Sequence, residues 1–192
     1  MMKEFDGIRM SLEGQHREQS DAMGELVTSV IFVLCVIFAL MAIPFNSYVQ
    51  PLIIMCTIPF GLIGAIMGHV ICMKPLSFLS ILGILALMGV IVNDSLVLVD
   101  YINKKVKAGI PIKDAVWTAG AARFRPILLT SLTTFAGLTP ILLERSLQAQ
   151  FLIPMAISLG FGILFATFIT LLLVPVAYLV LEDVKGLFIR KK

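Results

Sequence analysis

Apolar residues dominate five long stretches of the chain, and short polar segments separate them. Crossing ~30 Å of hydrocarbon takes ~20 residues of α-helix, so an apolar run of this length predicts a membrane span. Such runs lie at about residues 26–43, 49–72, 76–101, 126–143 and 151–181. None has the period-two alternation of transmembrane β-strands. The pattern predicts an all-α membrane protein, built as a bundle of five transmembrane helices over residues 26–182.

The polar segments flank and interrupt this bundle. Residues 1–25 carry mixed charge, and residues 183–192 form a basic tail. Within residues 111–124, Ala115, Val116, Ala119 and Phe124 recur at about helical spacing, with Trp117 among them. This spacing predicts a short helix on the cytoplasmic membrane surface, with the indole at the level of the lipid headgroups. An ordinary amphipathic connector is the alternative.

Basic residues predict how the spans are oriented. They concentrate in the loop between the third and fourth spans and in the C-terminal tail, whereas the turns on the other face hold only Lys74 and Arg145. The positive-inside rule places the basic segments in the cytoplasm. An odd number of spans then places the N-terminus outside. A bare polar segment there leads us to expect a chain that has lost its front part.

Composition excludes several classes of function. The chain is 59% hydrophobic with a formal net charge of +3, which does not suggest a nucleic-acid partner. Its three cysteines fall in apolar runs without metal-ligand spacing, so buried free thiols and no metal site are expected. There is no nucleotide-binding phosphate loop. A membrane aspartyl protease would need a second deep carboxylate. We therefore expect neither an enzyme nor a cofactor.

The motif GVIVNDSLVLVDY, residues 89–101, places Asp94 inside the third apolar run. The carboxylate lies about eight residues from the end of its span, hence ~12 Å deep at 1.5 Å per residue. Insertion scales assign ~2.5–3.5 kcal/mol to an Asp at mid-helix, and such residues usually face the bundle interior and mark an ion or proton path. A protonated or hydrogen-bonded structural group is the alternative. Asn93 points ~100° away, on another face.

The fourth span begins RFRPILLTSLTTF, which supplies basic and hydroxyl groups. Spans adjacent in sequence are usually adjacent in space, so a linkage from Arg123 or Thr130 to Asp94 is physically possible. Ser131 belongs to the same candidate set. Hydroxyls in membrane helices also bond back to their own helix, and this local role is the alternative.

Glycines predict close helix packing in two places. Gly64 and Gly68 form a GxxxG pair, which permits close approach of helices. We assign Gly89 the same packing role. His69, near the outer end of this span, is expected to be a boundary polar residue rather than a metal ligand.

Three segments together resemble the C-terminal half of a resistance-nodulation-division (RND) efflux permease of the hydrophobe and amphiphile branch. They are FNSYVQPLIIMCTIPFGLIGAIMGH, GVIVNDSLVLVDYINKKVKAG and AGAARFRPILLTSLTTFAGLTPILL. The resemblance implies a twelve-span permease with two large periplasmic domains, of which this chain would supply spans eight to twelve. Residues 1–25 would be the tail of the second periplasmic domain. It also implies the bacterial inner membrane, with a periplasmic N-terminus and a cytoplasmic C-terminus.

The resemblance further implies proton coupling. In the family, a carboxylate pair in the first half, absent here, couples to positions that correspond to Asn93, Arg123 and Thr130. Drug exporters often carry Lys where this chain has Asn93, so Asp94 is expected to supply the titratable group instead. The candidate relay is therefore Asp94, Asn93, Arg123, Thr130 and Ser131, with protons as the coupling ion.

The implied function is export of amphiphilic or xenobiotic compounds. The implied partners, besides lipid, are the missing N-terminal half and, in a complete trimer, a periplasmic adaptor and an outer-membrane channel. Two alternatives stay open from the sequence. The chain could be a non-transporting truncated fragment or membrane scaffold, or a protein-translocation accessory of the same superfamily.

Overall fold

The computed structural model describes residues 13–189, and every regular element among them is a helix. The elements are α1 (Glu13–Phe45), α2 (Val49–Met55), α3 (Ile58–Ile71), α4 (Phe78–Lys107), α5 (Ile112–Leu143), the 3-10 helix η1 (Ala149–Phe151) and α6 (Ile153–Ile189). The predicted all-α class is confirmed.

The chain divides into two units, residues 1–37 and residues 38–192. The described part of the first unit belongs to the single helix α1. This helix begins at Glu13, well before the span expected from residue 26, so half of the polar segment 1–25 is helical. The other half, residues 1–12, lies outside the described residues.

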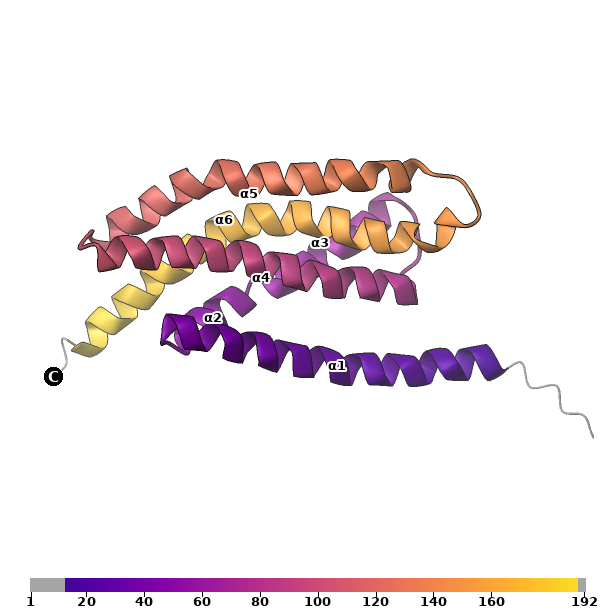
Figure 1. Ribbon diagram of the computed structural model, residues 1–192, viewed down its shortest axis with the longest axis horizontal. Helices are drawn as coiled ribbons and strands as arrows, with labels where there is room; N and C mark the ends of the chain where they lie inside the picture. The colour runs from indigo at the N-terminus through magenta and orange to yellow at the C-terminus, as the bar shows by residue number, and fades with distance from the viewer. Residues whose placement is uncertain (1–12, 190–192) are drawn as a thin grey trace, which may run out of the picture. The chain divides into compact units, whose positions relative to one another are not determined.

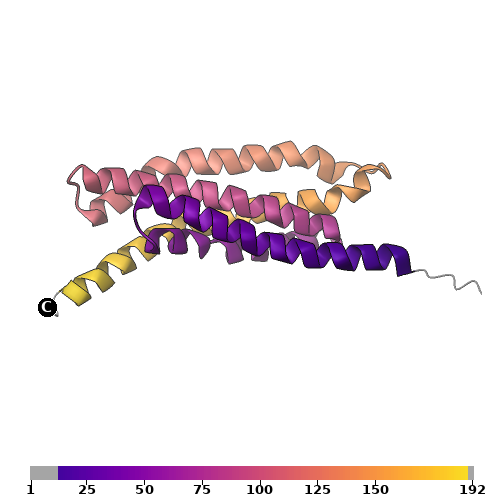
Figure 2. The same ribbon diagram turned by 60° about the horizontal axis from the view of Figure 1, so that its bottom comes forward.

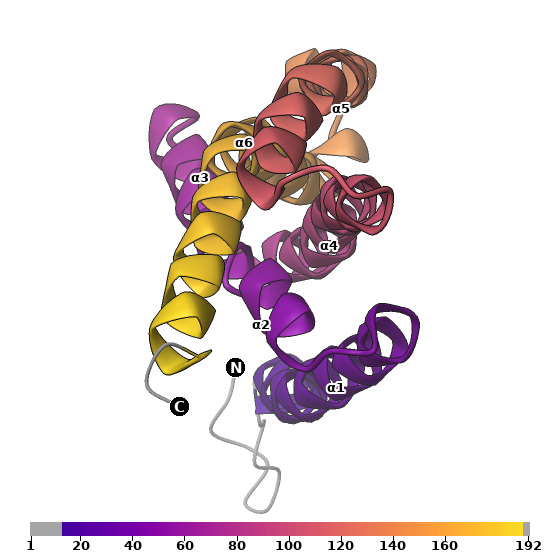
Figure 3. The same ribbon diagram turned by 90° about the vertical axis from the view of Figure 1, so that its left-hand side faces the viewer.

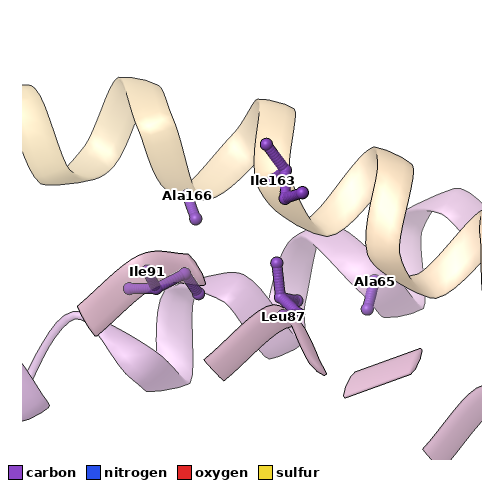
Figure 4. Packing of buried hydrophobic residues seen from close by; sticks show 5 residues of the cluster. All are labelled: Ala65, Leu87, Ile91, Ile163 and Ala166. Carbon is purple, nitrogen blue, oxygen red and sulfur yellow. The ribbon is translucent and has the colours of Figure 1, made fainter. Parts of the chain in front are cut away.

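In the second unit, α6 lies at the centre. It contacts α3, α4 and α5, and its C-terminal end extends beyond them (Figures 1 and 3). Helices α4 and α5 run side by side and are joined by a short turn (Figure 2). The buried core forms where α3, α4 and α6 meet, and Figure 4 shows Ala65, Leu87, Ile91, Ile163 and Ala166 directed toward one another. Alanine at two of these positions keeps the helices close.

Five helical segments are long and apolar enough to cross a membrane, as predicted. They are Ala22–Phe45, Val49–Ile71, Phe78–Lys107, Ile112–Leu143 and Ile153–Leu181. Two of them extend the predicted elements. Helix α4 begins at a capping box of Ser77 and Ser80 and continues to Lys107, beyond the expected end at residue 101. Helix α6 runs on to Ile189, into the segment predicted as a basic tail, whose last three residues lie outside the described range.

The second predicted span is interrupted. It divides into α2 and α3 at Cys56 and Thr57, just before Pro59. A proline ring clashes with the carbonyl four residues earlier, here that of Met55, and lacks an N–H to bond to it. The Thr57 hydroxyl donates a 2.6 Å hydrogen bond to the Ile54 carbonyl, which satisfies an acceptor at the end of α2.

The fourth predicted span differs from the prediction in the opposite sense: it is joined to a neighbouring element instead of being divided. The surface helix expected over residues 111–124 and the span expected from Pro126 form one continuous helix, α5. Ala115, Val116 and Ala119 are buried within the bundle, so this apolar face packs on protein rather than on the membrane surface. Trp117 points away from the bundle and is 84% exposed. Tertiary packing thus keeps α5 helical through a proline.

A polar cluster joins three helices near the basic end of the bundle. Gln50 and Asn103 exchange two side-chain amide hydrogen bonds, of 3.1 and 2.9 Å, which link α2 to α4. The Tyr178 hydroxyl of α6 donates to the Asn103 side-chain oxygen at 2.6 Å. Polar groups away from water are costly unless paired, so this reciprocal pairing fixes the relative positions of α2, α4 and α6.

Small residues set the distance between α3 and α6. A methyl group on Gly64 would lie 2.5 Å from the Phe165 Cβ, and one on Gly68 would lie 2.5 Å from the Phe161 Cβ. Both positions therefore lie directly against α6. Gly89 does not share the role assigned to it: a methyl group there would meet no atom of the described chain within 4 Å. Gly89 is on an exposed face of α4.

We predict that Gly68→Ala destabilises the bundle. The clash involves the Phe161 Cβ, which moves only with its helix, and overpacking of this kind costs about 1–3 kcal/mol. Gly89→Ala is the matched control, since it gains helix propensity of up to about 1 kcal/mol without a clash. The free energies of unfolding of the two variants, measured in the same micelles, test the idea. A Gly68→Ala chain as stable as Gly89→Ala would contradict it.

Candidate functional site

Asp94 borders a small cavity between α4 and α6. The cavity is lined by Val90, Ile91, Asp94, Ile163, Ala166, Thr167 and Thr170. Its volume is about 10 Å³, close to the smallest space that holds one water molecule. Asp94 is half-buried, so its carboxyl faces the bundle rather than solvent or lipid alone. A mid-span carboxyl beside a polar, water-sized space can exchange a proton with a bound water.

The periodicity of the two helices creates this site. Val90 and Asp94 are four residues apart and therefore lie on one face of α4. Ala166 and Thr170 have the same spacing on α6, and Thr167 lies beside them. Thr167 and Thr170 are only 3% and 2% exposed. Two buried threonines thus line the same cavity as Asp94.

The Thr167 hydroxyl connects this cavity to α5. Its oxygen lies 2.5 Å from the Ser131 hydroxyl oxygen, and both groups are buried. Each hydroxyl also reaches a carbonyl of its own helix, Ile127 at 3.0 Å for Ser131 and Ile163 at 2.8 Å for Thr167. Two hydroxyl protons cannot fill three hydrogen bonds at once. One hydroxyl therefore donates to the other while the second donates to its own helix, and the two arrangements can interchange.

Arg123 is placed elsewhere than expected. Its guanidinium lies over the Tyr101 ring, 5.0 Å from the centroid, in a cation–π contact between α5 and α4. Its Nε atom is buried and has no hydrogen-bond partner among the described residues. Asp94 and Arg123 do not form an ion pair in the described structure.

Thr130 and Asn93 also lie away from Asp94. Thr130 is exposed and donates to the Pro126 carbonyl at 2.9 Å, the local back-bonding considered as an alternative. Asn93 is exposed. The expected linkage from Arg123 or Thr130 to Asp94 is not formed. The reason is rotational: neighbouring helix positions diverge by ~100°, so only Ser131 of the Thr130–Ser131 pair faces inward.

Of the five candidate relay residues, the structure thus brings two near Thr167: Asp94, which lines the same cavity, and Ser131, which bonds to it. Sequence reasoning missed Thr167 and Thr170. The available signal was their three-residue spacing within the apolar run FATFITLLL, which puts two hydroxyls on one helix face.

His69 is more than a boundary residue. It is 4% exposed, and both ring nitrogens have partners. Nδ1 lies 3.1 Å from the Lys74 carbonyl, which can only accept, so Nδ1 carries the proton. Nε2 lies 2.9 Å from the Ser158 hydroxyl of α6. The imidazole therefore ties α3, the following turn and α6 together.

Metal-ligating groups do not gather in the described chain, where no cluster of three His, Cys, Asp or Glu side chains occurs. The cysteines also correct an expectation. Cys35 and Cys56 are exposed and Cys72 is half-buried, rather than all three being buried. Asp100, at the cytoplasm-predicted end of α4, pairs with Lys104 at 2.7 Å.

The chain belongs to the AcrB/AcrD/AcrF family, whose model it matches over residues 2–182. It is similar to the swarming motility protein SwrC of Bacillus subtilis, with 28% identity over 92% of this chain and 17% of that protein. It is also similar to the multidrug resistance protein MdtC of Erwinia amylovora, with 26% identity over 93% of this chain and 18% of that protein.

A solved structure shares the fold. The crystal structure of a heavy metal efflux pump (crystal form II) matches with a TM-score of 0.80 and 28% identity, over 88% of this chain and 17% of that chain. The resemblance to an RND permease is confirmed, and the chain is a multipass membrane protein. It spans less than a fifth of the length of these relatives.

We predict that Ser131→Ala weakens the contact between α5 and α6. The substitution removes the hydrogen bond to Thr167, and such bonds within membranes average about 0.6 and reach about 1.7 kcal/mol. Thr130→Ala is the neighbouring control, because its exposed hydroxyl bonds only to its own helix. Unfolding free energies measured side by side decide the matter. Equal losses in the two variants would show that the cross-helix bond contributes nothing.

Proposed function

We propose that this chain is the C-terminal membrane part of a proton-driven RND exporter of amphiphilic or xenobiotic compounds in the bacterial inner membrane. The observation that carries the proposal is the Asp94 carboxyl at a water-sized cavity, beside the buried hydroxyls of Thr167 and Thr170. A carboxyl at this depth is costly when ionised and is usually kept for an ion or proton path.

Protonation of Asp94 would change which hydrogen-bond donors and acceptors the carboxyl needs from the groups around the cavity. The ionised carboxylate only accepts hydrogen bonds, whereas the neutral acid also donates one. Hydroxyls suit both states, because each can donate or accept. The cavity therefore tolerates gain and loss of a proton with a rearrangement of hydroxyls and one water. Arg123, Thr130 and Asn93 would act, if at all, through groups supplied by the rest of the permease.

Export is supported by the relatives. Two are a multidrug resistance protein and a heavy metal efflux pump. Substrate binding, the trimer, the periplasmic adaptor and the outer-membrane channel belong to the missing parts of the permease. The basic segments support a cytoplasmic C-terminus and a periplasmic N-terminus.

We predict that Asp94→Asn abolishes proton-linked dye export when the chain is produced together with a matching N-terminal half. Asn has the shape of Asp but cannot exchange a proton, so export falls toward background while the amount of protein in the membrane stays constant. Asp100→Asn is the control, since this exposed carboxylate of the same helix only pairs with Lys104. Thr167→Val gives a partial loss.

Unchanged export by the Asp94→Asn variant would refute the proton role. Absence of export by the unmodified chain with its N-terminal half would favour the non-transporting fragment or scaffold instead.

A further inference from the structure

A second and larger cavity lies at the other end of the bundle from the basic α4–α5 turn. The turn between α3 and α4 and the loop between α5 and η1 border it, and both lie at one end of the helices (Figure 1). Its volume is about 550 Å³, within the range of ~300–1,000 Å³ typical of ligand sites. It is separate from the Asp94 cavity, with which it shares no lining residue.

The lining of this outer cavity is layered. Its apolar wall is made of the last residues of α5 and the first turns of α6, namely Leu142, Leu143, Ile153 and Ile157. Its polar rim is made of Lys74, Glu144, Arg145 and Gln150 from the two connections. Since α5 and α6 are membrane spans that end and begin here, the apolar wall lies at the edge of the hydrocarbon and the rim at the headgroup level.

The rim carries a surplus of positive charge. Lys74 and Arg145 form no ion pair with any described side chain. The Glu144 carboxylate accepts hydrogen bonds from the backbone N–H groups of Arg145 at 2.9 Å and Ser146 at 3.0 Å. These bonds lower the pKa of Glu144 and keep it ionised, but they commit its Oε1 oxygen to its own loop. Two cations against one internally engaged anion favour an anionic ligand.

Hydrogen bonds to His69 hold the backbone of Lys74 in place. Its carbonyl accepts from His69 Nδ1 at 3.1 Å, and its N–H donates to the His69 carbonyl at 3.1 Å. His69 is in turn bonded to Ser158 of α6. One side of the rim is therefore pre-organised, which lowers the entropic cost of binding.

From this layering we propose that the outer cavity binds an anionic phospholipid of the surrounding bilayer. The phosphate would lie between Lys74 and Arg145, and the first part of an acyl chain along Leu142, Ile153 and Ile157. Basic sites between membrane helices recognise lipid headgroups in this way. The inference goes beyond the proposed export function and does not depend on it.

Cys72 provides a reporter, because it lines the outer cavity and is half-buried. The full chain is placed in bilayers of phosphatidylcholine with increasing fractions of phosphatidylglycerol. The rate of Cys72 alkylation by N-ethylmaleimide is followed by mass spectrometry and compared with the rate in phosphatidylcholine alone. We expect phosphatidylglycerol to slow the alkylation of Cys72 several-fold, and we expect this protection to saturate at a low fraction of phosphatidylglycerol.

The double variant Lys74→Gln, Arg145→Gln should lose this protection. Its matched control, Lys107→Gln, Lys113→Gln, removes the same charge from the opposite end and should keep it. Protection that persists in the first variant, or that rises without saturation in the unmodified chain, overturns the proposal. Protection by submicellar dodecyl sulfate but not by phosphatidylglycerol also overturns it, and assigns the cavity to free amphiphiles. The saturation test needs no variant, so misfolding of the double variant cannot hide the answer.

Discussion

Close approach of α3 and α4 to the central helix α6 is the constraint on which the second unit depends. Helix association in a bilayer gains little from the hydrophobic effect, because lipid tails are as apolar as leucine, and so relies on van der Waals contact and interhelical hydrogen bonds. Gly64 and Gly68 lie against phenylalanines of α6, and Gly162 of α6 lies against Leu87. Only with these backbones close together can the short side chains of Asp94, Thr167 and Ser131 reach one shared region.

Polar contacts between helices occur at three levels along α6. His69 bonds Ser158 near the end opposite the basic α4–α5 turn, Ser131 bonds Thr167 in the middle, and Asn103 bonds Tyr178 toward the basic end. Each contact joins α6 to a different neighbour, α3, α5 or α4. A sliding or rotation of any one helix would leave a donor or acceptor unpaired in an apolar surrounding, at a cost of about 1–3 kcal/mol. The three levels therefore specify register and rotation, while the glycines specify distance.

The sequence predicts the positions of the helices along the chain well and the rotation of each helix about its axis poorly. Run lengths placed the five spans, and the insertion cost of a carboxylate singled out Asp94. The GxxxG spacing located the approach to α6 at Gly64 and Gly68. The sequence could not show whether Thr130 or Ser131 points into the bundle. Adjacent residues point to different faces of a helix, and only the packing of the helices decides which face is buried. Nor could the sequence predict that the two prolines would have different effects. The helix breaks just before Pro59, whereas α5 continues through Pro126, and the residues earlier in α5 are packed in the bundle.

The two hydroxyl protons of Ser131 and Thr167 would link the charge on Asp94 to the hydrogen bonds of α5. An ionised carboxylate favours donors turned toward the cavity, and Thr167 can turn its proton there only by releasing the Ile163 carbonyl. The Thr167 oxygen then accepts from Ser131, whose proton leaves the Ile127 carbonyl of α5. When Asp94 is protonated, Thr167 no longer needs to donate into the cavity, and Ser131 can return to its own helix. Under the proposed proton role, a change of charge on α4 would change the hydrogen bonding of α5 through Thr167 of α6, and neither Arg123 nor Thr130 would have to touch the carboxyl.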